Sequence, residues 1–394
     1  MGSSGHPLTS IEICAGAGGQ AVGLHGAGFR HVALVEIDKH AVETLKLNVR
    51  NRKGWDWERK HCDVLPMDVK EFDPFVHITK SKIVEGELSL LAGGVPCPPF
   101  SIAGKQLGAD DERDLFPTML NLVDKLRPQS VMIENVRGIL EPFTKFKSYR
   151  DQIAERLNDS GYVVCGWKVL EARDYGVPQL RPRAILVAIR KDCYRGFGWP
   201  DSNEKPLVTV AQALAKSMRR RFGDDKARYK KWHDQAKLGT VAPTLVGGSK
   251  KHGGADLGPS RAKAAWVALG VDGMGVANDE KDVVPRRDLH RPNGPMLTVA
   301  QAAIIQGFPE DWEFHGGKTA RYRQVGNAFP APVAEAVGLS IAEALGRTGP
   351  VLPDPNSIHK HEDDSLFPVD YLPAQEPGAA FADRVEDRER ALVR

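Results

Sequence analysis

The residues best suited to chemistry surround one cysteine in the first third of the chain. Cys97 follows Pro96 and a short apolar run at 88–92, which predicts a buried strand bounded by glycines. A cysteine at the end of a strand, followed by a Gly-rich polar loop to residue 113, lies where open α/β sheets gather their functional groups. Such a thiol could act as a nucleophile. The same pattern also fits a small buried cysteine at a strand end.

A second predicted strand ends in an acidic residue. Residues 130–133 form a short apolar run, and Glu134 follows at once. If the sheet is parallel, the carboxyl ends of its strands meet at one edge, and Glu134 faces the same crevice as Cys97.

Two arginines precede a further strand, predicted at 184–189. Gln179, Arg181 and Arg183 alternate along the chain as it enters this strand, and the period of two places both arginine side chains on one face. A surface salt bridge is the ordinary alternative for such residues.

The first part of the chain predicts a scaffold that could position these groups. A strand-like run at 10–14 enters the glycine-rich turn at 15–19, a helix is predicted at 20–28, and a second strand at 31–35 ends in Glu36. Glycines let the backbone approach a ligand closely, and a carboxylate at the second strand end can accept two ribose hydroxyls. This βαβ unit therefore predicts a site for an adenine nucleoside.

The unit does not identify the nucleoside by itself. Gly16, Gly18 and Ala21, with Glu36 following, also fit a nicotinamide dehydrogenase, and a structural turn without a ligand is a further alternative. Asp63, which Val64 follows, forms another acidic turn that could contact an adenine amino group.

Composition sets broad limits on the function. Of the 394 residues, 41% are hydrophobic and 27% charged, as in ordinary soluble globular proteins, and the net charge of +3 requires any nucleic-acid affinity to come from a local basic face. The five scattered cysteines include no CxxC pair, so we expect neither a disulfide framework nor a metal site. No apolar run approaches the roughly 20 residues of a membrane span, and the N-terminus does not resemble a secretory signal, so a cytoplasmic location is expected.

The pattern of elements predicts four segments. Strands and helices alternate through 1–193, an irregular basic region covers 194–295, regular structure returns at 296–348, and 349–394 is a loosely ordered tail rich in proline and acidic residues. Basic residues interleaved with aromatics in the second segment suit phosphate contact and base stacking, and a solvated charged face is the alternative.

The order of these features resembles the DNA cytosine-5 methyltransferases, most closely the compact bacterial enzymes of restriction-modification systems. The resemblance covers roughly residues 9–346. It rests on the glycine turn at 15–19, Glu36, Asp63, the Pro-Cys loop at 96–108, Glu134 with the two residues after it, the set of Gln179, Arg181 and Arg183, and the closing motif at 323–327. The family often has phenylalanine where this chain has Cys14.

The resemblance implies an α/β fold. It predicts a Rossmann-like S-adenosylmethionine-dependent methyltransferase domain with a mostly parallel sheet, plus a smaller irregular target-recognition domain at 194–295. The implied reaction moves a methyl group from S-adenosylmethionine to C5 of a flipped cytosine in a specific duplex site, leaves S-adenosylhomocysteine, and needs no metal. Cys97 is then the nucleophile that bonds to C6, Glu134 acts at N3 and N4, and Arg183 acts at O2.

The resemblance also implies two sets of binding residues. The cofactor contacts are Cys14, Ala15, Gly16, Ala17, Gly18, Gly19, Glu36, Ile37, Asp63, Val64, Pro96, Leu115 and Asn327. The substrate contacts are Ser101, Gln179, Arg181, Ser249, Lys250 and Lys251, while residues 219–221 and 230–231 are expected at DNA phosphates. The expected partner is double-stranded DNA, bound by a monomer near the bacterial nucleoid. Two alternatives stay open: a restriction endonuclease that acts on the same site without direct contact, and an orphan enzyme without such a partner.

Two related functions are weighed against this one. A catalytically silent DNA-binding relative would be expected to lose the nucleophile, and Cys97 and Glu134 are both present. Transfer-RNA methyltransferases of the same fold usually carry a Cys-Phe-Thr signature that this chain lacks, so DNA is the favoured substrate.

Overall fold

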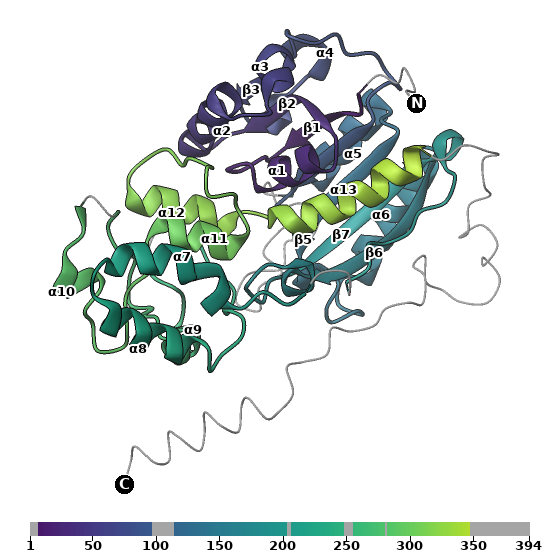
Figure 1. Ribbon diagram of the computed structural model, residues 1–394. Helices are drawn as coiled ribbons and strands as arrows, with labels where there is room; N and C mark the ends of the chain where they lie inside the picture. Colours follow the sequence, from purple (N-terminus) through teal and green to yellow (C-terminus); the bar gives the residue numbers. More distant parts are fainter. Residues whose placement is uncertain (1–6, 97–113, 203–205, 248–254, 280–281, 347–394) are drawn as a thin grey trace, which may run out of the picture.

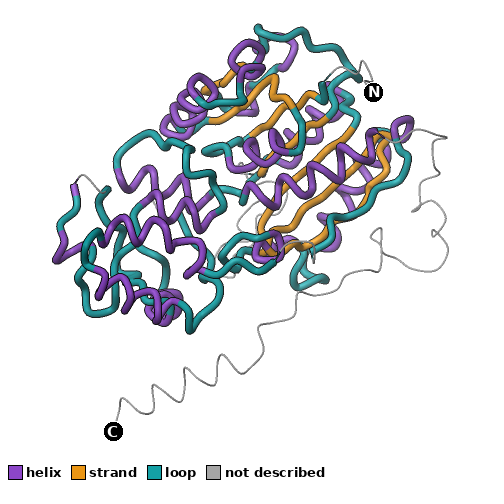
Figure 2. Tube along the Cα trace, in the orientation of Figure 1, coloured by secondary structure: helices purple, strands orange, loops and turns teal. Residues whose placement is uncertain are grey.

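A seven-stranded sheet forms the centre of the molecule, which we describe from a computed structural model covering residues 7–96, 114–202, 206–247, 255–279 and 282–346. The strands follow the order β3-β2-β1-β4-β5-β7-β6 (Figures 1 and 2). Their bounds are β1 Thr9–Ile13, β2 Arg30–Glu36, β3 Asp63–Pro66, β4 Leu90–Gly94, β5 Ser130–Val136, β6 Tyr162–Glu171 and β7 Pro182–Arg190. Strands β1 to β5 pair in parallel, and β7 runs antiparallel to both of its neighbours. The prediction of a mostly parallel α/β sheet is confirmed.

Helices cover both faces of the sheet (Figure 1). On one face, α5 (Phe116–Leu126) and α6 (Lys147–Asp159) pack against side chains such as Val131 and Ile133. On the other, α1 (Gly19–Gly26) and α13 (Ala331–Gly346) lie side by side over the intervening residues of the same strands. The two helices approach so closely that a Cβ at Gly23 would lie 2.2 Å from the carbonyl oxygen of Ala331. The last described helix, α13, therefore packs against the first helix, α1, and the two complete the core on this face of the sheet.

Further helices and 3₁₀ turns form the connections between the strands of the sheet. Helices α2 (Lys39–Asn51), α3 (Asp56–His61) and α4 (Pro74–His77) lie between β2 and β4 in the chain. The described 3₁₀ turns are η1 Val69–Glu71, η3 Arg137–Ile139, η4 Ala172–Tyr175 and η5 Lys191–Cys193. Of these turns, η1 matters most for function because it follows the carboxyl end of β3.

The region predicted to be irregular, 194–295, contains helices. They are α7 (Val210–Phe222), α8 (Lys226–Ala236), α9 (Ser260–Ala268) and α10 (Pro285–Asp288). A capping box between Thr209 and Gln212 starts α7, and this pair of residues is recognisable in the sequence. Together with α11 (Val299–Gln306) and α12 (Lys318–Asn327), these helices form the lower left of Figure 1.

This helical region shares one hydrophobic core with the segments around it. Leu214 and Met218 of α7 belong to the same buried cluster as Val299, Val325 and, from α2, Leu45. Arg221 also turns inward, since its Nη1 donates to the carbonyl of Met296 at 2.8 Å and to Gln301. The prediction that all three arginines at 219–221 contact phosphates is therefore wrong for Arg221, which joins α7 to the segment before α11.

The apolar segment at 318–346 is part of the protein core. By length and composition it could span a membrane, but 56% of its most apolar 18-residue stretch is buried within the protein. Helix α13 supplies most of this burial by packing on α1 and on the sheet. Its hydrophobicity therefore has a structural explanation.

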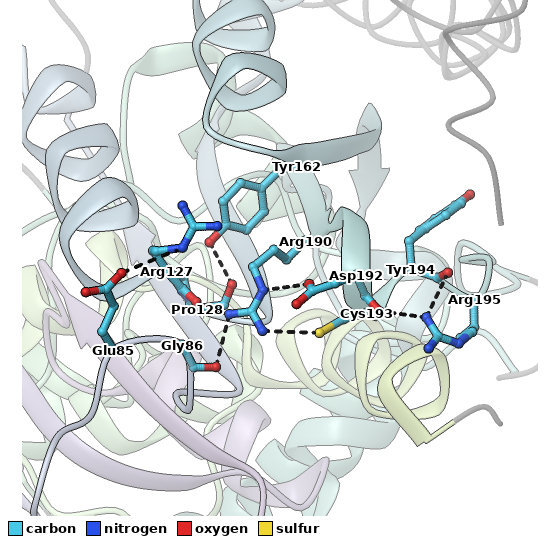
Figure 3. Close-up of polar contacts among 10 residues, drawn as sticks. All are labelled: Glu85, Gly86, Arg127, Pro128, Tyr162, Arg190, Asp192, Cys193, Tyr194 and Arg195. Atoms are coloured by element: carbon cyan, nitrogen blue, oxygen red, sulfur yellow. Dashed lines mark hydrogen bonds and ion pairs between the residues drawn. The ribbon is translucent and has the colours of Figure 1, made fainter. Parts of the chain in front are cut away.

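The edge of the sheet where β5 begins is held together by Arg190 (Figure 3). Its guanidinium donates to the carbonyls of Gly86 (3.0 Å) and Arg127 and forms an ion pair with Asp192. Tyr162 contributes from β6, where its hydroxyl donates to the carbonyl of Pro128 at 2.7 Å. Because β5 begins here, the functional groups predicted at the carboxyl ends of the parallel strands lie at the opposite edge.

Candidate functional site

A cavity of about 320 Å³ opens at the carboxyl ends of the central parallel strands. We call it the central cavity. Its walls are the glycine turn with Glu12 and Gln20, Val35 with the segment 36–38 and Ala41, the segment 67–69, Gly94, Pro96, Leu115, Glu134, and Arg323, Gln324, Asn327, Ala328 and Phe329. Its volume lies in the range of small-molecule sites, roughly 300–1,000 Å³. Most of the predicted cofactor residues meet here.

The glycine turn forms one wall of the central cavity through unusual backbone angles. Cys14, Gly16 and Gly18 have φ values of 51°, 54° and 87°, in the left-handed region that favours glycine. At Gly18 a side chain is excluded by space as well, because a Cβ would lie 2.6 Å from the ring of Trp312. Helix α1 begins at Gly19, the last residue of the turn, and its first residues line the cavity. Its unpaired N–H groups and its dipole therefore suit an anionic group of a ligand.

Glu36 fixes the turn against the end of β2. Its Oε2 accepts from the backbone N–H of Gly16 at 2.6 Å, and its Oε1 accepts from those of Ile37 and Asp38 at 2.9 and 2.7 Å. The carboxylate is thus oriented by three donors before any ligand binds. Beside it, Ile37 is 68% exposed and presents an apolar side chain at the cavity.

Asp63 lies at the wrong end of its strand to contact a ligand in the central cavity. In the parallel pairing of β2 with β3, Asp63 is opposite Ala33, so it begins β3 rather than ending it. Its Oδ2 accepts from the backbone N–H groups of Thr79 (2.7 Å) and Lys80 (2.9 Å). Neither Asp63 nor Val64 lines the cavity, and both predicted cofactor roles are corrected.

Asp68 occupies the place expected for that acidic residue. It follows the carboxyl end of β3, starts η1 by accepting from the N–H of Lys70 at 2.9 Å, and lines the central cavity with Met67 and Val69. Asp68 is visible in the sequence five residues after Asp63, but the sequence does not show where the short strand β3 ends.

Glu134, which lines the central cavity, forms an ion pair with Arg183. Strand β7 runs antiparallel to β5, so Arg183, near its start, lies beside the carboxyl end of β5. Its Nε donates to Oε1 of Glu134 at 2.8 Å, and both side chains are only 14% exposed. Burial raises the pKa of Glu134 above its ordinary value, although Arg183 and Arg181 oppose that rise. The structure thus brings together two of the three predicted catalytic residues.

The strand end that leads to Cys97 is fixed next to this pair. Asn135 donates from Nδ2 to the carbonyl of Val95 at 2.9 Å, and a Cβ at Gly94 would lie 2.9 Å from Oε2 of Glu134. The N–H of Leu115 donates to the carbonyl of Pro96 at 3.3 Å, and both residues line the central cavity. Cys97 and Ser101 lie outside the described residues, between these two points.

Cys14 is a second cysteine at the cavity, but its surroundings disfavour the thiolate. Burial raises its pKa to about 12, and the carboxylates of Glu36, Asp68 and Glu12 add to the effect. A thiol with this pKa remains protonated at neutral pH and is a poor nucleophile. Its position fits the predicted contact with a bound ligand.

Gln179 and Arg181 are buried and hold chain segments together. Arg181 is 2% exposed, and it donates to the carbonyls of Leu245 at 2.7 Å and Gly326 at 2.8 Å. Gln179 is fully buried, donates to the carbonyl of Ile305 and accepts from the N–H of Leu245. These side chains are not accessible to a duplex. The predicted substrate contacts are therefore corrected to positioning roles, which for Arg181 is the structural role that the resemblance also implied.

The segment joined by Arg181 touches the wall of the cavity directly. A Cβ at Gly247 would lie 2.1 Å from Oδ1 of Asn327, and one at Gly326 would lie 2.5 Å from the N of Gly247. Asn327 lines the central cavity, as predicted for a cofactor residue. Ser249, Lys250 and Lys251 follow Gly247 closely in the chain but lie outside the described residues.

Two polar residues of the cavity were not anticipated from the sequence. Glu12 of β1 is buried, and burial together with nearby Glu36 raises its pKa. Gln20 is buried at the start of α1, and neither of its side-chain polar atoms has a hydrogen-bond partner among the described residues. Buried polar groups are normally paired, so both point to a polar ligand. No cluster of His, Cys, Asp and Glu suited to a metal ion occurs in the described part of the chain.

The order of the strands, with β7 reversed between β5 and β6, is that of the α/β methyltransferase fold. The fold is similar to that of the methyltransferase EhMeth of Entamoeba histolytica, with a TM-score of 0.57 and 14% identity over 87% of this chain and 100% of that one. The chain belongs to the C-5 cytosine-specific DNA methylase family, whose sequence profile matches residues 8–343. It is therefore a DNA (cytosine-5-)-methyltransferase, and the nicotinamide alternative is excluded.

Two curated relatives show the same membership at higher identity. The Type II methyltransferase M.NaeI of Lentzea aerocolonigenes is 48% identical over 346 residues, which are 87% of this chain and 76% of that protein. The Type II methyltransferase M.NgoMIV of Neisseria gonorrhoeae is 44% identical over 342 residues, which are 86% of this chain and 98% of that protein.

The two acidic residues of the β3 region give opposite predictions. Asp68→Ala removes a carboxylate from the cavity wall and should raise the dissociation constant for S-adenosylhomocysteine at least about tenfold, as expected for losing a hydrogen bond to a charged acceptor. Asp63→Ala leaves two backbone N–H groups unpaired and should lower the free energy of unfolding by about 1–3 kcal/mol without changing that constant. Calorimetric titration and urea unfolding of both variants check this, and the reverse pattern would restore the original assignment of Asp63.

Gly247 should matter for the cofactor although it does not line the cavity. Gly247→Ala must displace Asn327, because the new Cβ and Oδ1 cannot occupy positions 2.1 Å apart. We expect weaker binding of S-adenosylhomocysteine, by roughly tenfold, or about 1.4 kcal/mol. Gly198→Ala is the matched control, since its Cβ would meet no atom within 4 Å. Equal dissociation constants in the two variants would show that the contact has no effect on the cavity.

Proposed function

We propose that this enzyme methylates C5 of one cytosine within a specific duplex DNA sequence through a covalent bond between Cys97 and C6. The observation that carries the proposal is the buried Glu134–Arg183 pair, held beside the strand end that leads to Cys97, with Glu134 at the wall of the central cavity. A proton donor, a guanidinium and a nucleophile would then surround one position. A cytosine ring placed there would meet all three groups.

Methyl transfer to C5 requires these groups because C5 of cytosine is a weak nucleophile. Cys97 adds to C6 as a thiolate, which turns the C4–C5–C6 unit into an enamine whose C5 can attack a methyl group. Bound S-adenosylmethionine supplies that methyl group as an electrophile and leaves as S-adenosylhomocysteine. Loss of the C5 proton then lets the Cys97 sulfur depart and restores the aromatic ring.

Glu134 and Arg183 stabilise the ring during the addition. A carboxyl group whose pKa is raised by burial retains its proton to higher pH, so Glu134 can donate at N3 and contact the amino group on C4. Arg183 keeps a permanent charge and can hold O2, where negative charge develops. The ion pair between them fixes both side chains before the base arrives.

The cavity residues fit the parts of S-adenosylmethionine. Glu36 would accept the ribose hydroxyls, Asp68 the adenine amino group, and Ile37 would pack on the adenine ring. The N-terminus of α1 would meet the methionine carboxylate. Glu12 and the unpaired amide of Gln20 would bind at the polar methionine end, where an ammonium group can pair with a buried carboxylate.

A base inside a duplex cannot reach this cavity, so the target cytosine must be flipped out of the stack. We assign the choice of DNA sequence to 194–295, the region between the catalytic motifs, in particular to the side chains of 246–252 and 260–263. Arg219, Arg220, Lys230 and Lys231 are exposed at the end of α7 and on α8 and would contact phosphates. Because its relatives are named Type II methyltransferases, we place this enzyme in a bacterial restriction-modification system. We further propose that it acts as a monomer in the cytoplasm, at the nucleoid.

The nucleophile is tested by Cys97→Ser. Methyl transfer should fall more than about a hundredfold, since the loss of a catalytic nucleophile is among the largest single-residue effects. Wild-type enzyme should also form a covalent adduct with DNA that carries 5-fluorocytosine at the target position, because the fluorine cannot leave as a proton does. Cys193→Ser, far from the cavity at the Arg190 edge (Figure 3), is the control and should retain both properties. An adduct formed by Cys97→Ser would rule out the assignment.

A further inference from the structure

Trp312 lies directly behind the glycine turn. It belongs to the segment between α11 and α12, is 4% exposed, and does not line the central cavity. Its indole Nε1–H donates to the carbonyl of Ala17 at 3.0 Å, and its ring fills the space that a side chain on Gly18 would need. The side chain therefore contacts the turn without lining the central cavity.

The ring of Trp312 is itself held in place from several directions. The ring of Phe308 stacks near it at a centroid distance of 6.2 Å, and Trp55 lies at 5.6 Å. The guanidinium of Arg52 lies 5.6 Å from the ring centre and forms an ion pair with the neighbouring Asp311. A ring held in this way can fix the position of the backbone that it contacts.

The turn needs such support because its own sequence specifies little. Glycine populates many backbone conformations, so Gly16, Gly18 and Gly19 lose more freedom on ordering than other residues would. Within the turn, the N–H of Gly18 donates to the carbonyl of Ala15, and Glu36 holds Gly16. The contact of Trp312 with Ala17 fixes the remaining residue of the turn ahead of α1.

We propose that Trp312 is a positioning residue for the methyl-donor site. It fixes the carbonyl of Ala17 and the path of the backbone at Gly18, so that the wall of the cavity is formed before the ligand binds. This role rests on the proposed use of the cavity for S-adenosylmethionine. Losing it should weaken binding of the cofactor without changing the chemical step, because pre-organisation lowers the cost of binding.

Three variants of buried tryptophans separate the hydrogen bond from the ring. Trp312→Phe keeps an aromatic ring but removes the N–H donor. Trp312→His keeps an N–H at the equivalent position of a five-membered ring but removes the larger ring. Trp266→Phe is the matched control, since Trp266 is fully buried in the same hydrophobic cluster and its Nε1 has no partner among the described residues.

The measurements are the dissociation constant for S-adenosylhomocysteine and the steady-state constants for methyl transfer. Trp312→Phe should raise the dissociation constant and the cofactor KM by about three- to tenfold, the range of one net hydrogen bond, while kcat at saturating cofactor stays within about twofold. Trp312→His should bind the ligand more tightly than Trp312→Phe, and Trp266→Phe should bind like the wild type. Thermal unfolding of each variant confirms that folded proteins are compared.

Two results would overturn the inference in different ways. If wild type binds S-adenosylhomocysteine and Trp312→Phe binds it as tightly as Trp266→Phe does, Trp312 has only a structural role. The same conclusion follows if kcat falls as much as the affinity. If wild type does not bind the ligand at all, the proposed function of the cavity fails, and the positioning role fails with it.

Discussion

The ion pair between Glu134 and Arg183 depends on one feature of the sheet, the reversed direction of β7. In a sheet of parallel strands, residues at the start of a strand lie at the edge away from the functional groups. Because β7 is antiparallel to β5, its first residues lie at the carboxyl edge instead, and Arg183 meets Glu134 there. Removing two charges from water is costly unless they are well paired, so the pair also fixes the geometry of this edge. The proposed chemistry requires that fixed geometry.

Distant parts of the chain must be held together to build the rest of the cavity. Arg181 is the clearest case, since its buried guanidinium binds carbonyl oxygens of Leu245 and Gly326, which are far apart in the sequence. Gly247 then contacts Asn327 at the cavity wall, and Trp312 supports the glycine turn from behind. The region expected to read DNA thus shares its supports with the cavity, which links the two physically.

The sequence predicted the sheet, the glycine turn and the strand-end carboxylates. Apolar runs, glycines and the polar residues that follow a strand are all local features of the sequence. It failed where the answer depended on distant partners. Asp63 was misplaced because a four-residue strand does not reveal which end carries its acidic residue. Gln179 was taken for a substrate contact because nothing local shows that its partners include backbone groups of 245 and 305. The helices within 194–295 could have been found in part, since the capping box at Thr209 is visible in the sequence.

The account is tested most directly by titrating the carboxyl group of Glu134. Difference infrared spectroscopy of its C=O band, with Glu134→Gln as the blank, gives the pKa in wild type and in Arg183→Gln. We predict a wild-type pKa above the ordinary value of 4.5, because burial outweighs the opposing arginines, and a further rise in Arg183→Gln, because that variant removes the stabilising cation. A wild-type pKa at or below 4.5, or no rise on removing Arg183, would contradict the buried, paired proton donor on which the mechanism depends.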